Sequence, residues 1–211
     1  HMVRELMGRG VTDKRVLAAM ASVPRERFVP PDLRAEAYAD RALPIGGGQT
    51  ISQPYVVAVM AQAAELSPTD RGAEIGTGSG YGAAVLAKLA SEVWTVERRG
   101  DLAHQARRRL RAEGLRQVHV MMGDGALGWR PAAPYDAIVV TACAPSVPPA
   151  LVDQLADGGR LVIPVGPHHE VQTLTQIRRR HGELITTELA PVRFVPLVTE
   201  HSYDNSNSDT E

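Results

Sequence analysis

The chain lacks the residues and segments that mark secreted and membrane proteins. Its 211 residues include a single cysteine, Cys143, so no disulfide can form within the chain. No apolar run approaches the length that spans a bilayer, and the first residues lack the charged-then-apolar pattern of a secretory signal. A cytoplasmic protein is therefore expected.

An excess of charge of one sign is lacking as well. The 23 lysines and arginines balance 24 aspartates and glutamates, so the net charge of -1 gives no general attraction to nucleic acids or anionic lipids. The arginine-rich residues 107–111 fit the solvated face of a helix. His168, His169 and Glu170 lack the spacing of a helical metal site. We expect no nucleic-acid, membrane or metal partner, and we expect a monomer.

The chain does have enough apolar sequence to fill the core of one domain, because 44% of its residues are hydrophobic. We assign residues 3–198 to a single domain whose residues 3–54 form an N-terminal lobe of helices and loops. Residues 199–211 are polar and acidic, so we predict a disordered tail.

Helix and loop signals organise the N-terminal lobe. A first helix is predicted to be capped by Thr12 and ended by Pro24. Residues 28–54 are rich in proline and glycine and are predicted to be irregular and mobile. A second helix is predicted from Pro54 to about Glu65, because proline is favoured at the first helical position.

Beyond residue 70 the pattern alternates between strand and helix. The predicted strands are residues 72–75, 93–97, 118–122, 137–141 and 161–165, and the predicted helices are residues 81–90, residues 101–113 and one opened by Pro148 and Pro149. Two later strands, residues 171–178 and 184–189, lie close together as antiparallel strands do. The pattern predicts an α/β fold, doubly wound and Rossmann-like, with a mostly parallel sheet and late antiparallel strands.

A glycine turn joins the first of these strands to its helix. The sequence Glu-Ile-Gly-Thr-Gly-Ser-Gly-Tyr at residues 74–81 permits close approach of the backbone to a ligand, and Glu97 ends the next strand, where it can accept hydrogen bonds from ribose hydroxyls. Tyr81 stands where a dinucleotide fingerprint has its third glycine. S-adenosylmethionine, which has no phosphate, is therefore favoured; a purely structural turn is the alternative.

A second turn, Gly123-Asp124-Gly125, follows the third strand. It falls at the carboxyl edge, where open sheets bind ligands, and Asp124 can accept a hydrogen bond from the amino group of an adenine. Taken alone, the same sequence is more often only a turn.

Several short blocks occur in a specific order along residues 3–198. They are Val23-Pro24-Arg25 with Phe28-Val29-Pro30, residues 43–54, residues 74–81, Gly123-Asp124-Gly125 with Gly128-Trp129, Tyr135-Asp136-Ala137-Ile138, residues 158–166 and Val192-Arg193-Phe194-Val195-Pro196-Leu197. With this series the chain resembles the protein-L-isoaspartate (D-aspartate) O-methyltransferase family, which has the class I methyltransferase fold. Ala73, where a larger aliphatic residue is usual, and Cys143, where a smaller residue is common, are peripheral departures.

The resemblance implies S-adenosylmethionine as cofactor and isoaspartyl-containing proteins and peptides as substrates. The residues that it places at the cofactor are Glu74, Gly76, Thr77, Gly78, Ser79, Gly80, Glu97, Asp124 and Gly125. It places Thr50, Ile51 and Ser52 at the isoaspartyl group and Val165 at the substrate backbone. The implied reaction is methylation of the free α-carboxylate of L-isoaspartyl and D-aspartyl residues, which begins repair through a succinimide.

The chemistry of such a transfer favours hydroxyl side chains as the catalytic groups. A carboxylate with a pKa of about 4 is already ionised at neutral pH, so it needs positioning and partial desolvation and no general base. We predict that Ser52, with Thr50, orients it, since a hydroxyl donor leaves the oxygen reactive. The alternative for Ser52 is an ordinary helix cap before Pro54.

Two other functions remain open on this sequence. The same chemistry could act on a normal aspartate in one dedicated peptide, or the chain could be a non-catalytic cofactor-binding module. Comparing the aspartyl and isoaspartyl forms of one peptide distinguishes the first alternative from isoaspartyl methylation. Cofactor binding without turnover would indicate the second.

Overall fold

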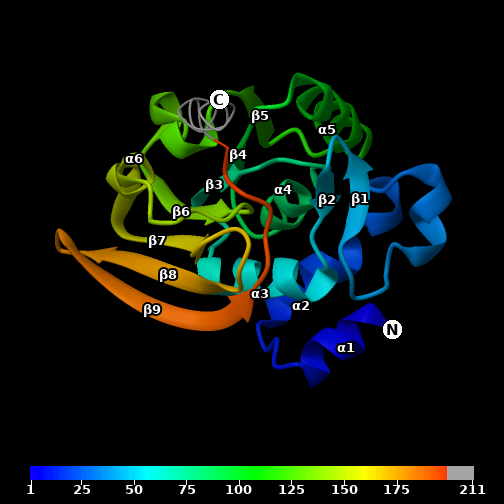
Figure 1. Ribbon diagram of the computed structural model, residues 1–211, viewed down its shortest axis with the longest axis horizontal. Helices are drawn as coiled ribbons and strands as arrows, with labels where there is room; N and C mark the ends of the chain where they lie inside the picture. The colour runs from blue at the N-terminus through cyan, green and yellow to red at the C-terminus, as the bar shows by residue number, and fades with distance from the viewer. Residues whose placement is uncertain (199–211) are drawn as a thin grey trace, which may run out of the picture.

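The computed structural model describes residues 1–198, so the predicted disorder of residues 199–211 lies outside the described residues. Its centre is a seven-stranded sheet in the order β5-β4-β3-β6-β7-β8-β9 (Figure 1). The strands are β3 (Arg71–Ile75), β4 (Glu92–Glu97), β5 (Val118–Met122), β6 (Tyr135–Val140), β7 (Leu155–Val165), β8 (Gln172–Arg180) and β9 (Glu183–Val192). Strands β3 to β7 pair in parallel, and β8 and β9 are antiparallel. The predicted mostly parallel sheet with late antiparallel strands is confirmed.

Helices cover both faces of this sheet. They are α1 (Met2–Gly8), α2 (Lys14–Ser22), α3 (Pro54–Ala64), α4 (Tyr81–Leu86), α5 (Gly100–Ala112) and α6 (Pro149–Asp153). Alternate residues of β6 point to opposite faces: Ala137 and Val139 pack in the core that α1 to α5 share, whereas Ile138 and Val140 pack with Leu151 of α6. The sheet is therefore doubly wound, as the sequence predicts.

The strand order reverses direction between β3 and β6. From β3 the chain proceeds through α4, β4 and α5 to β5 on one side, and then returns to place β6 on the other side of β3. In open α/β sheets the crevice at such a reversal, outside the carboxyl ends of the strands, is where ligands bind.

The N-terminal lobe is more regular than its composition predicts. Its residues 28–54 follow a short 3₁₀ helix (Arg25–Arg27) and contain a second 3₁₀ helix (Pro31–Glu36) and a two-stranded hairpin of β1 (Leu43–Gly46) and β2 (Gln49–Ile51). The prediction of an irregular stretch is wrong here, because the pairing of Leu43 with Ile51 buries both side chains in the core. Only the tip of the hairpin, with three glycines at positive φ, matches the expected loop chemistry.

Two helix boundaries also differ from the sequence prediction. The cap of α2 is Asp13 and not Thr12, because the Asp13 carboxylate accepts hydrogen bonds from the backbone N–H of Arg15 and Val16 at 2.8 and 3.3 Å. Helix α4 ends at Leu86, four residues before the predicted end.

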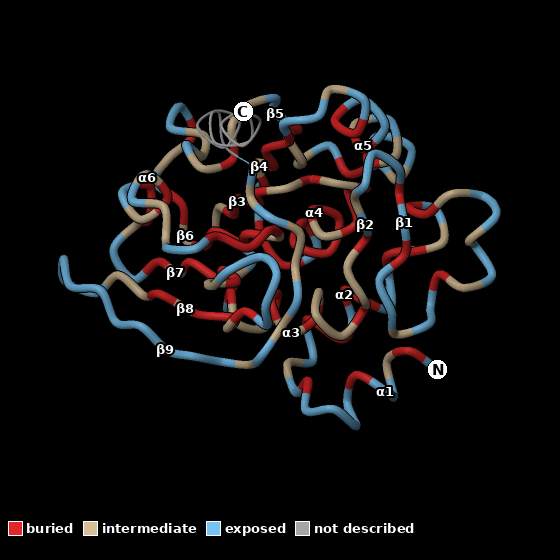
Figure 2. Tube along the Cα trace, viewed as in Figure 1, coloured by how far each residue is buried: buried red, intermediate tan, exposed pale blue. Residues whose placement is uncertain are grey.

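The last strands form the exposed side of the sheet. Strand β9 is a long edge strand with no buried residue, while about half of the residues of β7 and β8 are buried (Figure 2). After β9 the chain turns back, and residues 193–198 cross the carboxyl ends of the central strands (Figure 1). This segment, the C-terminal strap, enters the site described below.

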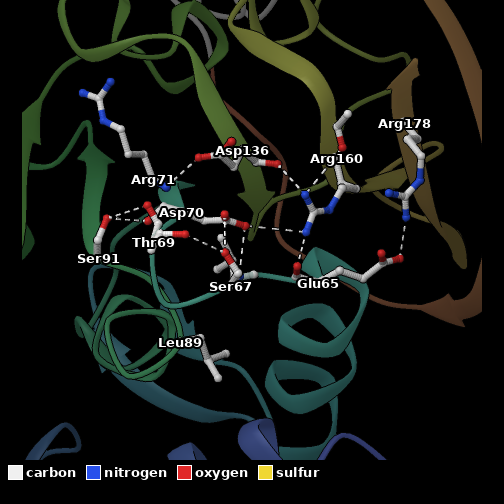
Figure 3. A network of polar contacts seen from close by, with 12 residues as sticks. Glu65, Ser67, Thr69, Asp70, Arg71, Leu89, Ser91, Asp136, Arg160 and Arg178 are labelled. Carbon is white, nitrogen blue, oxygen red and sulfur yellow. Dashed lines mark hydrogen bonds and ion pairs between the residues drawn. The ribbon is translucent and has the colours of Figure 1, made fainter. Parts of the chain in front are cut away.

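The amino edge of the sheet is closed by a polar network (Figure 3). The Asp136 carboxylate accepts from the backbone N–H of Arg71 at 2.8 Å, and the Arg160 guanidinium donates to the main-chain carbonyls of Asp136 and Glu65. Arg160 also lies 3.8 Å from the Asp70 carboxylate. These contacts connect β3, β6 and β7 to the end of α3 at the edge opposite the strap.

Among residues 1–198, no helix combines the length and apolar character needed to cross a bilayer.

Candidate active site

A cavity of about 380 Å³ opens where the carboxyl ends of β3 and β4 meet the segment after β6. Its lining residues come from the hairpin, the glycine turn, the two strand ends and the strap, and they include Thr50, Ile75, Gly76, Gly78, Glu97, Gly125, Thr141 and Pro196. The cavity thus lies at the reversal point of the sheet, and its volume falls in the range of about 300–1,000 Å³ typical of small-molecule sites.

Glycine is required at two positions beside this cavity. Gly76 has a φ of +91°, and a Cβ atom there would clash with the hydroxyl of Thr141. A Cβ atom at Gly125 would clash with the side chain of Ile75. The bare backbone at both turns therefore leaves room for a ligand to approach the strand ends.

Glu97 is fixed as an acceptor at the end of β4. One carboxylate oxygen accepts from the backbone N–H of Gly78 at 2.9 Å, and the other accepts from the backbone N–H of Arg99 at 2.9 Å. Each oxygen keeps a further lone pair, so the carboxylate can also accept hydrogen bonds from a diol at the cavity. This geometry fits the predicted contact with ribose hydroxyls.

A second cavity, of about 330 Å³, lies next to the first. It is lined by Ala42, Thr50, Ser52, Gln53, Val56, Thr141, His168, Arg193, Phe194, Val195 and Pro196. Thr50, Thr141 and two strap residues line both cavities. A ligand at the glycine turn and a ligand under residues 50–53 would therefore meet at these shared walls.

The β1–β2 hairpin carries Thr50 to this position. Thr50 pairs with Pro44 across the hairpin, and the tip at Gly47 lies against the guanidinium group of Arg99. The hairpin therefore bridges from the N-terminal lobe to the end of β4, over the first cavity.

Ser52 lines the second cavity and does not cap the helix that follows. The N-cap of α3 is Gln53, which makes no side-chain cap bond, and no cap bond involves the Ser52 hydroxyl. The helix-cap alternative for Ser52 is therefore wrong. Its main-chain carbonyl instead accepts a hydrogen bond from Arg25 at 2.7 Å.

Glu74 lies below the glycine turn and away from the 380 Å³ cavity. Its side chain is completely buried, accepts a hydrogen bond from the Thr95 hydroxyl at 2.6 Å and lines a small pocket of about 20 Å³ with Ser52 and Gly82. Burial raises the pKa of Glu74 to about 8, in part offset by the Thr95 bond. Burial therefore favours the neutral form of this carboxyl group, which lies beneath the turn, and its predicted contact with the cofactor stays a prediction.

Three other turn residues have buried contacts within the protein. The Thr77 hydroxyl lies 2.7 Å from the Thr95 hydroxyl, the Ser79 hydroxyl accepts from the backbone N–H of Tyr81, and Gly80 lies against Leu110 of α5. With these side chains engaged inside the protein, the three residues can contact a cofactor through their backbone atoms or after the side chains move on binding. The predicted contact stays a prediction.

Four further predicted residues divide between the cavity and the scaffold. Gly125 lines the first cavity, and Asp124 caps the following 3₁₀ turn by accepting from the backbone N–H of Ala126 at 2.9 Å. Ile51 is buried in the core, and Val165 pairs with Thr173 and Ala144; neither lines the two cavities. Their roles toward a substrate stay predictions.

Thr141 and the strap are the residues that sequence reasoning missed. The Thr141 hydroxyl donates to the Gly76 carbonyl at 2.7 Å, so it holds the glycine turn as well as lining both cavities. The strap is fixed by Cys143, whose N–H donates to the Val195 carbonyl and whose carbonyl accepts from Leu197. The position of Thr141 at a strand end could have signalled its role, whereas the path of the strap is not encoded in a local pattern.

Within the described part of the chain, no group of three or more histidine, cysteine, aspartate or glutamate side chains is placed to hold a metal ion.

Comparison with known proteins identifies the family. The family model described as "Protein-L-isoaspartate(D-aspartate) O-methyltransferase (PCMT)" matches residues 1–202. A protein-L-isoaspartate O-methyltransferase of Opitutus terrae is 57% identical over 201 residues, which cover 95% of this chain and 86% of the relative.

Solved structures agree with this assignment. A protein-L-isoaspartate O-methyltransferase structure superposes with a TM-score of 0.84 at 28% identity over 94% of this chain, which spans 65% of that protein's length. A Plasmodium falciparum relative in complex with S-adenosyl-L-homocysteine superposes with a TM-score of 0.82 at 27% identity, covering 93% of this chain and 96% of that one. The class I methyltransferase fold and the two adjoining cavities thus agree with the family match: this chain belongs to the protein-L-isoaspartate (D-aspartate) O-methyltransferase family.

Proposed function

We propose that this protein transfers a methyl group from S-adenosylmethionine to the free α-carboxylate of L-isoaspartyl and D-aspartyl residues in damaged proteins and peptides. The observation that carries the proposal is the adjacency of two cavities that share Thr50 and Thr141. Membership of the family supports the reaction, and the S-adenosyl-L-homocysteine bound to the Plasmodium falciparum relative supports the cofactor.

The residues around the 380 Å³ cavity fit a nucleoside cofactor. Gly76 and Gly78 bring bare backbone to the cavity, and Glu97 offers a fixed acceptor for ribose hydroxyls. Asp124 and Gly125 would lie at the adenine, where Gly125 leaves space beside Ile75. When bound, S-adenosylmethionine supplies an electrophilic methyl group on its sulfonium. The protein's residues therefore have to hold the cofactor and exclude water.

The second cavity fits the acceptor. An α-carboxylate is ionised at neutral pH and needs no general base. Thr50 and Ser52 can donate hydroxyl hydrogen bonds to it, and these orient an oxygen without neutralising its charge. Arg193 and His168 also line this cavity and can contact the rest of the peptide. The two reactants would meet at the shared wall, which converts an encounter in solution into a step between positioned groups.

The product would close without help from the protein to a succinimide, whose hydrolysis returns part of the damaged residues to normal aspartate. We further propose action in the cytoplasm, as a monomer, on many damaged proteins and with no nucleic-acid or membrane partner. The balanced net charge of -1 supports the last of these.

The experiment that tests this function is transfer of labelled methyl to a defined isoaspartyl peptide beside the same peptide with normal aspartate. Label in the isoaspartyl form alone supports the proposal. Label in the normal form indicates a dedicated aspartyl methyltransferase, and cofactor binding by calorimetry without label in either peptide indicates a binding module.

A further inference from the structure

Arg25 is a charged residue completely buried in the core of the N-terminal lobe. Burying a cation is unfavourable by several kcal/mol unless its hydrogen bonds and charge are compensated. In the described structure no carboxylate forms an ion pair with Arg25, and its Nη1 atom has no hydrogen-bond partner. Burial accordingly lowers the pKa of Arg25 from its ordinary value. Stability alone gives little reason for a guanidinium group here.

The contacts of Arg25 explain better than stability why an arginine is buried at this position. Its Nε donates to the Ala37 carbonyl at 2.7 Å, and its Nη2 donates to the Ser52 carbonyl at 2.7 Å. Its guanidinium carbon lies 4.7 Å from the centre of the Tyr81 ring. One side chain thus joins three segments that are distant in sequence.

Two of these segments belong to the site. Ser52 lines the proposed acceptor cavity, and Tyr81 is the first residue of α4, directly after the glycine turn at the proposed cofactor cavity. Tyr81 is itself fixed by an edge contact with Phe28, with ring centres 5.7 Å apart. Residues 52–53 have no side-chain cap of their own. The bond from Arg25 joins the Ser52 carbonyl to the wall that contains Tyr81, while the start of α3 is held separately by the bond from the Tyr55 N–H to Asp40.

We infer that Arg25 is a positioning residue, which sets the segment carrying Ser52 against the glycine turn so that the acceptor faces the cofactor. This inference rests on the proposed function for its kinetic consequence. An arginine suits the task because its planar fork donates to two carbonyls from two separate nitrogens while it lies against an aromatic ring; a lysine offers its donors from a single nitrogen and has no planar face.

Arg15 provides a matched control. It also donates to two main-chain carbonyls, those of Leu66 and Leu89, at 2.6 and 2.8 Å, but both lie away from the two cavities. Arg15→Met therefore removes the same kind of contact without touching residues 52–53.

The test compares R25M, R25K and R15M with the parent protein in three measurements. We expect R25M to lower kcat/KM for an isoaspartyl peptide by about 10- to 100-fold, the scale of a misplacement of about 1 Å, and R25K to be intermediate. The Kd for S-adenosylhomocysteine, from calorimetry, should change by less than threefold. Amide hydrogen exchange at residues 51–53 should accelerate in R25M and stay unchanged in R15M, which should also keep normal peptide kinetics.

Three results would overturn the inference. In the first, R25M has the same peptide kinetics and the same amide exchange as the parent protein. In the second, R25M loses affinity for S-adenosylhomocysteine in proportion to its loss of peptide turnover. In the third, neither R25M nor R25K folds, which would make Arg25 a structural residue. If the parent protein does not methylate the peptide, the proposed function fails, while the exchange measurement still tests what Arg25 holds.

Discussion

The two edges of the same sheet are built for different tasks. At the carboxyl edge, β3 ends in the glycine turn, and the ends of β3, β4 and β6 meet two adjoining cavities and the strap that crosses them. At the amino edge, β3, β6 and β7 are joined by the network of Asp136, Arg160 and Asp70 (Figure 3). The polar side chains at the amino edge contact only other parts of the protein, whereas Thr50, Glu97 and Thr141 at the carboxyl edge also line an open cavity. Substitutions at the two edges should therefore separate activity from stability.

The largest expected effect is at the carboxyl edge, from Gly76→Ala. The new methyl group would clash with Thr141 and would be strained at a φ of +91°. We expect about 100-fold weaker binding of S-adenosylhomocysteine by calorimetry, equivalent to about 3 kcal/mol. Gly10→Ala is the matched control, because Gly10 has a φ of +94° but open space around it. Equal loss of affinity in both variants would contradict the assignment of the cavity.

The next effect is at the amino edge, from Arg160→Met. This change leaves the carbonyls of Glu65 and Asp136 without their donor, so we expect the free energy of unfolding to fall by about 2 kcal/mol in denaturant titrations. Arg178→Met, which removes an exposed pair with Glu65 at 2.6 Å, should cost less than about 1 kcal/mol. Both variants should keep normal peptide kinetics at 25 °C. A lower kcat with unchanged stability in Arg160→Met would contradict the assignment of the amino edge to stability and not to activity.

A smaller effect is expected from Ser52→Ala. Loss of one hydroxyl donor to the acceptor should reduce kcat/KM for the isoaspartyl peptide by about tenfold, because a hydrogen bond to a charged group is worth about 1.5 kcal/mol or more. The Kd for S-adenosylhomocysteine should not change, since Ser52 lines only the acceptor cavity and the small pocket at Glu74. Unchanged peptide turnover in this variant would show that the Ser52 hydroxyl does not act on the acceptor carboxylate.

The smallest effect is expected from Glu74→Gln measured near pH 5. The difference in the free energy of unfolding between this variant and the parent protein should grow as the pH rises. With its pKa raised to about 8 by burial, folded Glu74 keeps a proton that the unfolded chain releases near 4.5. The free energy of unfolding of the parent protein should therefore fall between these pH values, and the glutamine variant should lack this decline.

Glu65 at the amino edge should show the opposite slope. Burial favours its protonated form, but hydrogen bonds from Arg178 and Gln176 outweigh burial and lower its pKa. Its contribution to stability is present above its ordinary value of 4.5 and is lost as the pH falls. Glu65→Gln should therefore flatten the acid side of the stability profile. Identical pH profiles for both variants would contradict the difference between the two edges.

The sequence predicts the central scaffold well because its signals are local. Alternating apolar strands and amphipathic helices fix the parallel part of the sheet, and the glycine turn marks the first cavity at Gly76 and Gly78. The hairpin of β1 and β2 was missed because three consecutive glycines conceal its two short strands.

The remaining site features depend on contacts between distant segments. Thr141 and the strap join the cavities only through the folded chain, and no propensity rule places an arginine such as Arg25 in an apolar core. The motif predicts that Glu74 contacts the cofactor, which stays a prediction, and the burial of Glu74 beneath the turn could not be predicted from the motif.

The most direct test of the account is a crystal structure of the protein with S-adenosylhomocysteine and an isoaspartyl peptide. We predict the cofactor product along Gly76, Gly78 and Glu97, and the acceptor carboxylate within hydrogen-bond distance of the Thr50 or Ser52 hydroxyl, facing the cofactor sulfur. A peptide bound with its carboxylate remote from both hydroxyls, or a cofactor product bound outside the glycine turn, would contradict it.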